Sequence, residues 1–303
     1  MATLDPVSLK LFVAVMEEGT IANAANREHI AASAVSKRMS ELEQALNTEL
    51  FSRTNKGAVA TVAAYALLNR ARGVLNDMDD IFVQMGDYAA GMRGQVRVHA
   101  NISSITEFLP DSLKSFMEQY PSVQIHLQER ISSVIAKAVA DNMADIGFLN
   151  SGNYGENITL LPYHDDELVV IAPTGHALTS HRSVTLNEAL DYDFVGAHPG
   201  SATNNQLTKA AGDLGRSLRL RIQVSSYDAL SLMVAAGLGI GVMPRKSAQL
   251  YRRALKIKCV TLNEPWATRK LVVCVRSLDA LTPAARLLIN HICGPIYTGK
   301  PHS

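Results

Sequence analysis

The fold of the N-terminal region is decided by residues 32–46, which read Ala32-Ser33-Ala34-Val35-Ser36-Lys37-Arg38-Met39-Ser40-Glu41-Leu42-Glu43-Gln44-Ala45-Leu46. Apolar residues recur at Val35, Met39, Leu42 and Leu46, a spacing that places them on one side of an α-helix. The opposite side carries Ser33, Ser36, Lys37, Ser40 and Glu41. Hydroxyls and a few cations at this spacing are the groups that contact base edges and phosphates in a DNA groove.

The segments on either side of this helix predict a winged helix-turn-helix in residues 1–60. A first helix begins at an Asp5 cap followed by Pro6 and stops at Gly19. Thr20 can cap a second helix, from Ile21 to Glu28. The polar turn at 52–57, between Phe51 and Val59, has the character of a basic hairpin.

The charge distribution restricts how this chain could bind nucleic acid. Its 303 residues contain 29 Lys and Arg against 28 Asp and Glu, so bulk positive charge is excluded as the means of binding. Residues 1–60 carry six cations and seven acids. Four of the six cations, at positions 37, 38, 53 and 56, lie on the face that is predicted to contact DNA. We predict DNA contacts from this face, and the alternative is an ordinary solvated helix. The DNA-binding candidates are Thr20, Ser33, Ser36, Lys37, Arg38, Ser40, Arg53 and Lys56.

Residues 61–91 predict one long helix that links the two parts of the chain. The apolar residues that recur along it every three or four positions are Leu67, Leu68, Ala71, Val74, Leu75, Met78, Ile81, Phe82 and Met85. A lone helix cannot bury such a stripe on itself, so we expect it to pack against a partner helix. The alternative is an amphipathic helix that lies on its own domain.

Residues 92–303 alternate short apolar runs with helical stretches, which indicates an α/β domain with largely parallel sheets. The predicted strands are 95–100, 123–128, 146–149, 168–172, 194–197, 219–224, 240–243, 258–262 and 271–275. The first predicted helices are Ile105–Tyr120 and Ser132–Asn142. Ligands of parallel sheets bind beyond the strand C-termini, near helix N-termini.

The loops at those strand ends contain the candidates for a small-molecule site. Amides and hydroxyls at helix starts suit an anion or a polar molecule, although each serine could equally be a plain helix cap. No acid dominates these loops and Arg130 lies among them, so an anionic or neutral ligand is favoured over a cation. The candidates for this small-molecule site, which a regulator would use to bind its effector, are Asn101, Ile102, Ser103, Ser104, Ser132, Asn150, His198, Pro199, Gly200 and Ser201.

Several of these segments together resemble the LysR-type transcriptional regulators. The N-terminal likeness is carried by Leu9–Val15, Glu17–Thr20, Ala34–Ser36 and Leu50–Arg53, in one register over about 50 residues. Further matches are Gly94–Val98, Leu109-Pro110, Tyr120-Pro121, Ala144–Phe148 and Val234–Pro244, so the resemblance covers essentially the whole chain.

The resemblance implies double-stranded DNA as a partner and an effector-binding domain like type 2 periplasmic binding proteins. That domain would consist of two Rossmann-like subdomains, 93–162 with 268–303 and 163–267, and Ser103, Ser132 and the loop 198–201 would line the cleft between them. It also implies an antiparallel pair of linker helices in a homodimer, and a homotetramer. Effector binding would then change the spacing of the DNA-reading heads, and with it DNA bending or contact with RNA polymerase.

Two departures from the family pattern affect the DNA-binding region. Where the family often has Ser-Gln-Pro at the start of the recognition helix, this chain has Ala31, Ala32 and Ser33. The lost cap costs about 1 kcal/mol, and a glutamine that could contact an adenine edge is missing. Base preference should then depend more on Ser33, Ser36, Lys37 and DNA shape. The second departure follows the hairpin, where residues 60–64 lack the family's glycine.

Two other function classes are alternatives to a regulator. Enzymes are disfavoured because known nucleophile, phosphate-loop and zinc motifs are absent, and His164-Asp165-Asp166, the best cluster, would point to both faces of a strand. No cofactor or metal is expected. The second alternative is a free cytoplasmic solute-binding protein without a DNA target. Absence of a long apolar run or secretion signal, with three scattered cysteines, predicts a cytoplasmic protein without membrane contact.

Overall fold

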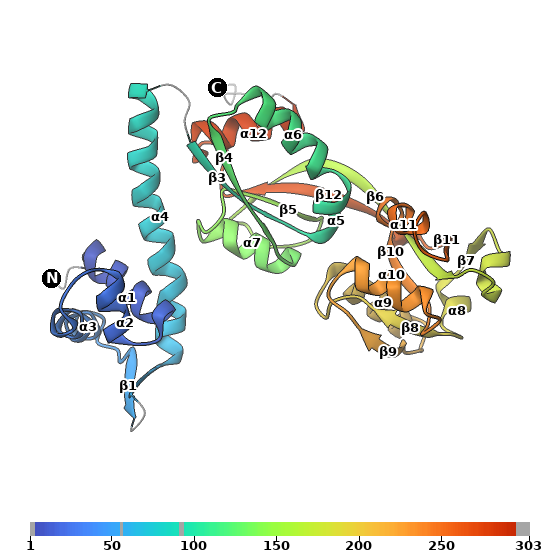
Figure 1. Ribbon diagram of the computed structural model, residues 1–303, viewed down its shortest axis with the longest axis horizontal. Coiled ribbons are helices and arrows are strands. Elements are labelled where there is room, and N and C mark those ends of the chain that lie inside the picture. The colour runs from blue at the N-terminus through green and yellow to red at the C-terminus, as the bar shows by residue number, and fades with distance from the viewer. Residues whose placement is uncertain (1–3, 55–56, 91–93, 295–303) are drawn as a thin grey trace. The chain divides into compact units, whose positions relative to one another are not determined.

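The computed structural model describes residues 4–54, 57–90 and 94–294 (Figure 1). The chain divides into two compact units. The first is Met1–Gly91 with Ala140–Met143, and the second is Met92–Val139 with Ala144–Ser303.

The first unit has three short helices, a hairpin and a long helix, as predicted for a winged helix-turn-helix. The elements are α1 (Pro6–Glu18), α2 (Ile21–Arg27), α3 (Ala32–Leu46), β1 (Phe51–Thr54), β2 (Gly57–Ala60) and α4 (Val62–Ala90). The side chain of Asp5 accepts from the Ser8 amide at 3.0 Å, which caps α1. Gly19, with φ of 73°, ends α1 in the left-handed conformation that glycine adopts most easily.

The core of this unit holds α3 and the hairpin in place. Phe12 of α1 is fully buried with Val35, Met39 and Leu42 of α3, so the helical spacing in the sequence predicted the buried side of α3. Glu43 then fixes the start of the hairpin, because its Oε1 accepts from the backbone amides of Leu50 at 2.8 Å and Phe51 at 2.9 Å.

Helix α4 packs its first turns onto its own domain, which corrects the expectation that the whole stripe needs a partner. Ala71 is buried in the first core, and Leu67, Leu68 and Leu75 pack against that core. Val74 and Ile81 stay 46% and 59% exposed, so among the described side chains of α4 they form an apolar part of the stripe that its own domain leaves uncovered. Phe82 and Met85 lie beyond the side chains that the structure describes.

The second unit is built on one large sheet with strand order β4-β3-β5-β12-β6-β11-β7, and β10 also pairs with β6. The strands are β3 (Gly94–Ala100), β4 (Val123–Glu129), β5 (Ile146–Asn150), β6 (Thr159–Pro173), β7 (Ser183–Val184), β10 (Gly241–Pro244), β11 (Ile257–Leu262) and β12 (Thr268–Val275). A separate pair joins β8 (Asp193–Gly196) and β9 (Arg219–Gln223). The expectation of largely parallel sheets was wrong, because β6 and β12 are antiparallel to each other and to their other neighbours in this sheet.

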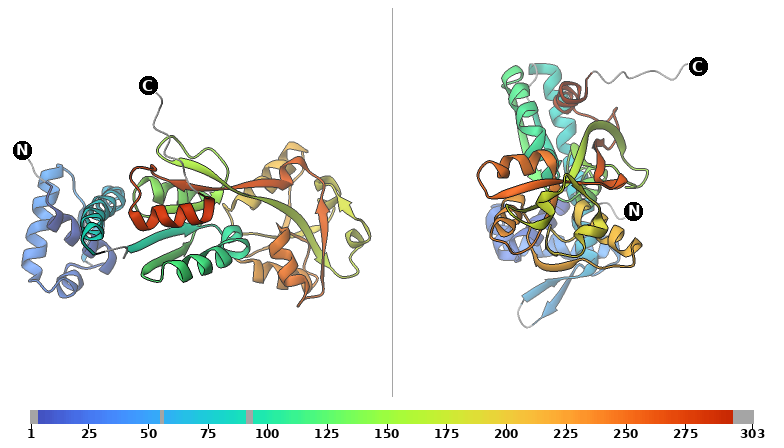
Figure 2. Two further views of the ribbon diagram at one scale, coloured as in Figure 1. Left: turned by 90° about the horizontal axis from the view of Figure 1, so that it is seen from above. Right: turned by 90° about the vertical axis from the view of Figure 1, so that its right-hand side faces the viewer.

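Strands β6 and β12 join the two halves of this unit (Figure 2). The first part of β6, Thr159–Glu167, pairs with β12, and its last part, Leu168–Pro173, pairs with β10 and β11. Only residues 168–172 of β6 and 271–275 of β12 were predicted as strand. In the first part of β6, Pro162 and the charged run 165–167 interrupt the apolar pattern, and β12 begins with the polar residues 268–270.

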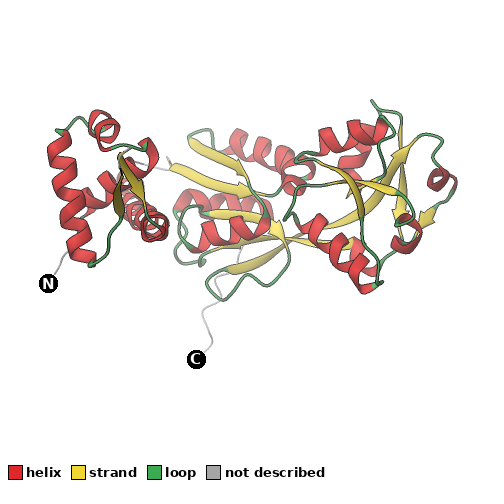
Figure 3. Ribbon diagram, turned by 90° about the horizontal axis from the view of Figure 1, so that it is seen from below, coloured by secondary structure: helices red, strands yellow, loops and turns green. Residues whose placement is uncertain are grey.

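Helices lie on both sides of the strands (Figure 3). The half with β3, β4 and β5, here called the β3 lobe, contains α5 (Ile102–Glu107), α6 (Leu109–Gln119), α7 (Ser132–Ala140) and α12 (Pro283–Cys293). The predicted helix 105–120 is therefore two helices, and Pro110 in the first turn of α6 explains the break, since proline disrupts a helix interior.

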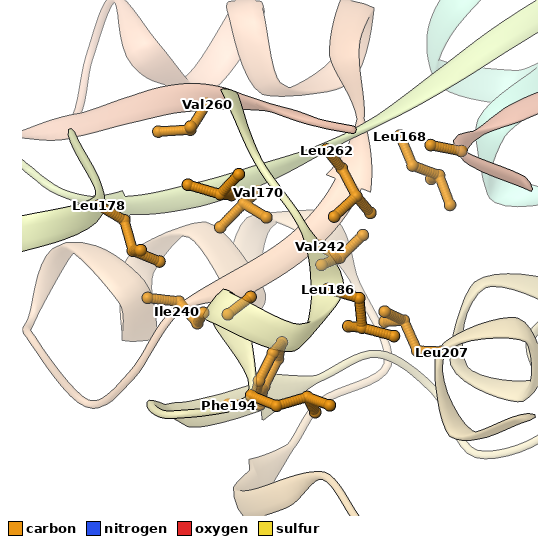
Figure 4. Close-up of a cluster of buried hydrophobic side chains, with 14 of the residues drawn as sticks. Leu168, Val170, Leu178, Leu186, Phe194, Leu207, Ile240, Val242, Val260 and Leu262 are labelled. Atoms are coloured by element: carbon orange, nitrogen blue, oxygen red, sulfur yellow. The ribbon is translucent and has the colours of Figure 1, made fainter. Parts of the chain in front are cut away.

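The other half, here called the β8 lobe, has its own apolar core (Figure 4). Its helices are α8 (Leu186–Ala189), α9 (Ala202–Asp213), α10 (Tyr227–Ala235) and α11 (Arg245–Arg252), and its short 3₁₀ turns are η1 (Ala177–Ser180) and η2 (Pro265–Ala267). Phe194, Ile240 and Leu186 are among the fully buried side chains of this core.

Across the described residues, no helix is long and apolar enough to traverse a bilayer.

Candidate functional site

Helix α3 presents the exposed polar face that the sequence predicted. Ser33, Lys37 and Ser40 are exposed and Ser36 is half-buried, at spacings of three and four residues. Lys37 Nζ lies 3.8 Å from Glu41 Oε1 and its side chain is 77% exposed, so the ammonium is free to meet a phosphate. Ala31 stands at the start of α3 without a side-chain cap, as the sequence analysis expected.

Arg38 lies on a different side of α3 from Lys37. Its Nη1 donates to Asp5 Oδ1 and to Ser8 Oγ, both at 3.2 Å, and so ties α3 to the start of α1. Hydrogen bonds from Ser8, with a contribution from the Arg38 charge, hold the pKa of Asp5 below its usual value. Arg38 therefore supports the helix pair in this structure, and a role at DNA would be additional.

The remaining DNA-binding candidates are Thr20, Arg53 and Lys56, and the structure describes the side chain of Thr20 alone among them. Thr20 is exposed, and its Oγ1 accepts from the Asn23 amide at 3.1 Å, so the side chain caps α2. Arg53 is part of β1, but its side chain is outside the described ones, and Lys56 lies outside the described residues.

A cavity of about 400 Å³ lies between the β3 and β8 lobes, here called the effector cavity. Seven of the ten effector-binding candidates line it: Asn101, Ile102, Ser103, Ser132, Asn150, His198 and Ser201. The other three do not. Ser104 is buried within α5, and Pro199 and Gly200 belong to a turn in which Gly200 has φ of 80°. That turn leads into Ser201, whose Oγ accepts from the Asn204 amide at 3.2 Å and caps α9.

Three side chains of the β3 lobe form one hydrogen-bonded set in this cavity. Asn101 Oδ1 accepts from the Ser104 amide at 2.9 Å, and Asn101 Nδ2 donates to Asn150 Oδ1 at 2.8 Å. Ser132 Oγ accepts from the backbone N–H of Asn150 at 3.3 Å. Because a backbone N–H can only donate, Asn101 must turn its oxygen to Ser104, and Asn150 must then turn its oxygen to Asn101.

A second arginine, Arg269 of β12, also lines the cavity and was not among the candidates from the sequence. Its Nη1 donates to Thr203 Oγ1 at 2.9 Å and its Nη2 to Ser103 Oγ at 3.3 Å, so it connects the two lobes. Nη2 also pairs with Asp166 Oδ2, and both side chains are at least nine-tenths buried. Asp166 of β6 and Arg269 of β12 face each other across two paired strands and carry opposite charges. Nothing in the sequence reveals that these two strands pair.

Tyr227 is a second cavity residue that was not among the candidates from the sequence. It is 5% exposed at the start of α10, and its hydroxyl lies 3.2 Å from Ser103 Oγ. Burial raises the pKa of Tyr227, so the phenol stays protonated and can serve as a hydrogen-bond donor or acceptor in the cavity.

Helices α7, α9 and α10 all begin with residues at the cavity wall: Ser132, Ala202 and Tyr227. The positive ends of these helices favour negative charge. At the rim, Arg130 is exposed and donates to the Glu129 carbonyl at 2.8 Å and to Gln128 Oε1 at 3.0 Å. Among the described residues, no group of three His, Cys, Asp or Glu side chains is placed to hold a metal ion.

Both units match models of one family. Residues 7–65 match the bacterial regulatory helix-turn-helix protein model, lysR family, and residues 89–293 match the LysR substrate binding domain. The chain therefore belongs to the LysR family: it is a transcriptional regulator with a helix-turn-helix DNA-binding domain and an effector-binding domain.

Individual relatives agree with this assignment. The chain is 27% identical over 287 residues to YbhD, an uncharacterized HTH-type transcriptional regulator of Escherichia coli K12, covering 93% of this chain and 90% of that one. The crystal structure of full-length CbnR complexed with its target DNA superimposes with a TM-score of 0.70 at 19% identity, covering 95% of this chain and 99% of that chain. The effector-binding domain of QuiR in complex with shikimate gives a TM-score of 0.60 at 17% identity, covering 67% and 96%.

Proposed function

We propose that this regulator binds a small organic anion or a neutral hydroxylated molecule in the effector cavity. The observation that carries the proposal is Asn150 Nδ2, a buried donor without a hydrogen-bond partner among the described residues. The Ser104–Asn101–Asn150 chain of hydrogen bonds orients this side-chain amide, so Nδ2 is the atom that points away from Asn101. A ligand with a hydrogen-bond acceptor at this position would satisfy the donor.

A second donor supports the same ligand chemistry. Arg269 Nε is buried without a partner among the described residues, while the other two nitrogens of the guanidinium are occupied. Asp166 neutralises most of the Arg269 charge, so the affinity for an anion would come from hydrogen bonds and from the three helix N-termini. Shikimate, which QuiR binds, is a hydroxylated carboxylate and belongs to this chemical class.

The DNA-binding unit acts in this proposal as one of a symmetric pair. Two α3 helices read an interrupted inverted repeat through Ser33, Ser36, Lys37 and Ser40, and α4 forms the dimer contact at its exposed stripe. A homotetramer is the larger assembly, and effector binding changes the spacing of its reading heads, and hence DNA bending or contact with RNA polymerase. The protein works in the cytoplasm, where bacterial DNA is, and catalyses no reaction.

Two experiments on the full-length protein test the proposal. In a gel-shift assay with the intergenic DNA beside its own gene, we expect a specific complex that weakens steeply with salt. No preference for that DNA over random duplex would favour the free solute-binding alternative. In a thermal-shift screen, hydroxylated monocarboxylates, shikimate included, should stabilise the protein more than their methyl esters do. If neither series stabilises the protein, the proposed ligand class is wrong.

A further inference from the structure

A second cavity, of about 310 Å³, is lined by none of the residues that line the effector cavity. Its charged lining residues are Glu107, Asp165, Asp166, Glu167, Arg245 and Lys246. They come from α5 of the β3 lobe, the crossing strand β6, and the start of α11 in the β8 lobe. The cavity therefore lies where the two lobes and a connecting strand meet.

The charges around this cavity do not balance. Arg245 occupies both oxygens of Glu167, with Nε to Oε2 at 2.6 Å and Nη2 to Oε1 at 2.8 Å. Asp166 Oδ2 is paired with Arg269. The lining residues that remain are two acids, Glu107 and Asp165, and one cation, Lys246. With all three ionised, the lining carries one negative charge more than it has positive charges.

Two carboxylate oxygens at this cavity are buried without a hydrogen-bond partner among the described residues: Asp166 Oδ1 and Glu107 Oε2. The Asp166 side chain is 1% exposed. The other oxygen of Glu107, Oε1, accepts from the amide and the hydroxyl of Ser247 at 3.0 and 2.9 Å. Burying carboxylate oxygens without donors is costly, so an occupant must supply both hydrogen-bond donors and positive charge.

Lys246 does not supply them in this structure. Its Nζ lies 4.0 Å from the centre of the Phe108 ring, in a cation–π contact, instead of at either oxygen. A metal ion is also disfavoured, because the described residues contain no group of three His, Cys, Asp or Glu side chains placed to hold one. An ammonium has one positive charge and several N–H donors on a compact head.

We propose that this cavity binds a small primary amine in its protonated form, with the ammonium between Asp166 Oδ1 and Glu107 Oε2. One bound ammonium satisfies both oxygens and removes the excess charge. Because Asp166 also holds Arg269 in the effector cavity, this second ligand shares one carboxylate with the effector site. The amine site itself does not depend on what the effector is.

The test measures stabilisation of the full-length protein by methylammonium chloride in thermal unfolding at neutral pH. Tetramethylammonium chloride, which has the same charge but no N–H donor, and potassium chloride serve as ionic controls. We expect methylammonium alone to raise the unfolding temperature in a saturable way. Equal effects of the three salts would mean charge screening or an inorganic cation, and would overturn the proposal.

Two variants locate the site. Glu107→Gln keeps an acceptor for Ser247 and places an N–H donor opposite Asp166, so it should weaken methylammonium binding about tenfold or more, since a charge-assisted hydrogen bond is lost. Glu129→Gln, at the rim of the effector cavity, is the matched control and should leave binding unchanged. The proposal is wrong if E107Q binds methylammonium as the natural chain does, or if E129Q alone abolishes binding.

A third variant keeps the proposal testable if E107Q does not fold. Lys246→Met removes the competing positive charge next to the site and should tighten methylammonium binding. If K246M weakens binding instead, Lys246 itself belongs to the occupied state and the ammonium site is not as proposed. In either case, carboxylate binding in the effector cavity remains a separate measurement, so failure of the amine site and failure of the effector proposal are distinguishable.

Discussion

Asn101 and Asn150 are joined by one buried hydrogen bond, 2.8 Å from Nδ2 to Oδ1, and that bond decides which end of Asn150 faces a ligand. The orientation originates in the backbone, because Asn101 Oδ1 accepts from the Ser104 amide at the start of α5. A helix cap therefore determines the hydrogen-bonding character of a cavity wall that comes from a different strand.

Replacing Asn150 with Asp tests the direct consequence. The variant keeps an oxygen for Asn101 but loses the free donor and adds a negative charge. We expect the affinity for a carboxylate effector to fall at least about tenfold, since a donor is lost and a repulsion is gained. Calorimetric titration measures the change, and Asn153→Asp, on the exposed loop after β5, is the control. Unchanged affinity in N150D would mean that the effector binds elsewhere.

Lys37→Ala tests the DNA-reading face. Because Lys37 is 77% exposed and has only a long contact to Glu41, it should act on DNA as a phosphate contact. We expect binding to weaken for all duplexes alike, and the slope of log affinity against log salt to fall by about 1 per protomer in contact. Lys10→Ala is the control, since Lys10 of α1 pairs through Nζ with Glu28 at the end of α2, at 2.7 Å. A selective loss for one base pair in K37A would show base contact instead.

The missing cap of α3 predicts a gain in stability. Ala31→Ser places a hydroxyl at a position whose backbone is already extended, with φ of −68° and ψ of 137°. We expect a gain of about 1 kcal/mol in local helix stability, which appears as about fivefold slower amide exchange in α3. Hydrogen exchange with mass spectrometry measures it, and Ala32→Ser, one position inside the helix, is the control. Equal effects of the two substitutions would contradict a capping origin.

Glu107 predicts a particular dependence of stability on pH. Burial, together with the nearby Asp166 carboxylate, raises the pKa of Glu107 above its ordinary value. The folded state then holds this proton more tightly than the unfolded state, so its contribution to stability is present below the ordinary carboxyl pKa and is lost as pH rises through the folded pKa.

The comparison of Glu107→Gln with the natural chain isolates this effect. The difference in unfolding free energy, E107Q minus natural chain, should grow from mildly acidic pH to neutral pH and then level off. Denaturant unfolding of both proteins at a series of pH values measures it, with Glu118→Gln, on the exposed side of α6, as control. A difference that shrinks with rising pH would contradict the assigned direction.

The exposed part of the α4 stripe predicts the dimer contact. Ile81 is 59% exposed although it belongs to the apolar side of the helix. Ile81→Glu should weaken self-association strongly, because burying one isoleucine contributes about 1.5–3 kcal/mol and the loss occurs twice in a symmetric dimer. Sedimentation of the full-length protein measures it, with Asp79→Asn, elsewhere on α4, as control. A dimer that persists unchanged in I81E would place the interface elsewhere.

Much of the first unit follows from its sequence. Asp5, Gly19 and Thr20 act on backbone groups within four residues of themselves, so their roles can be read locally. Val35, Met39 and Leu42 are buried at the spacing that a helix imposes on its apolar side. In the second unit, the same local logic placed Asn101, Ser132, Asn150 and Ser201 at strand ends and helix starts, and the structure brings them to one cavity.

The sequence by itself thus determined the helix starts and buried faces of the first unit and the loops that meet at the effector cavity, because capping and periodicity act over a few residues. Only the tertiary structure decided which distant charges meet. Arg38 contacts Asp5 across 33 positions, and Arg269 pairs with Asp166 across 103. Such pairs form because packing of other residues brings the strands and helices together, and their ionic attraction is nearly independent of the sequence between them.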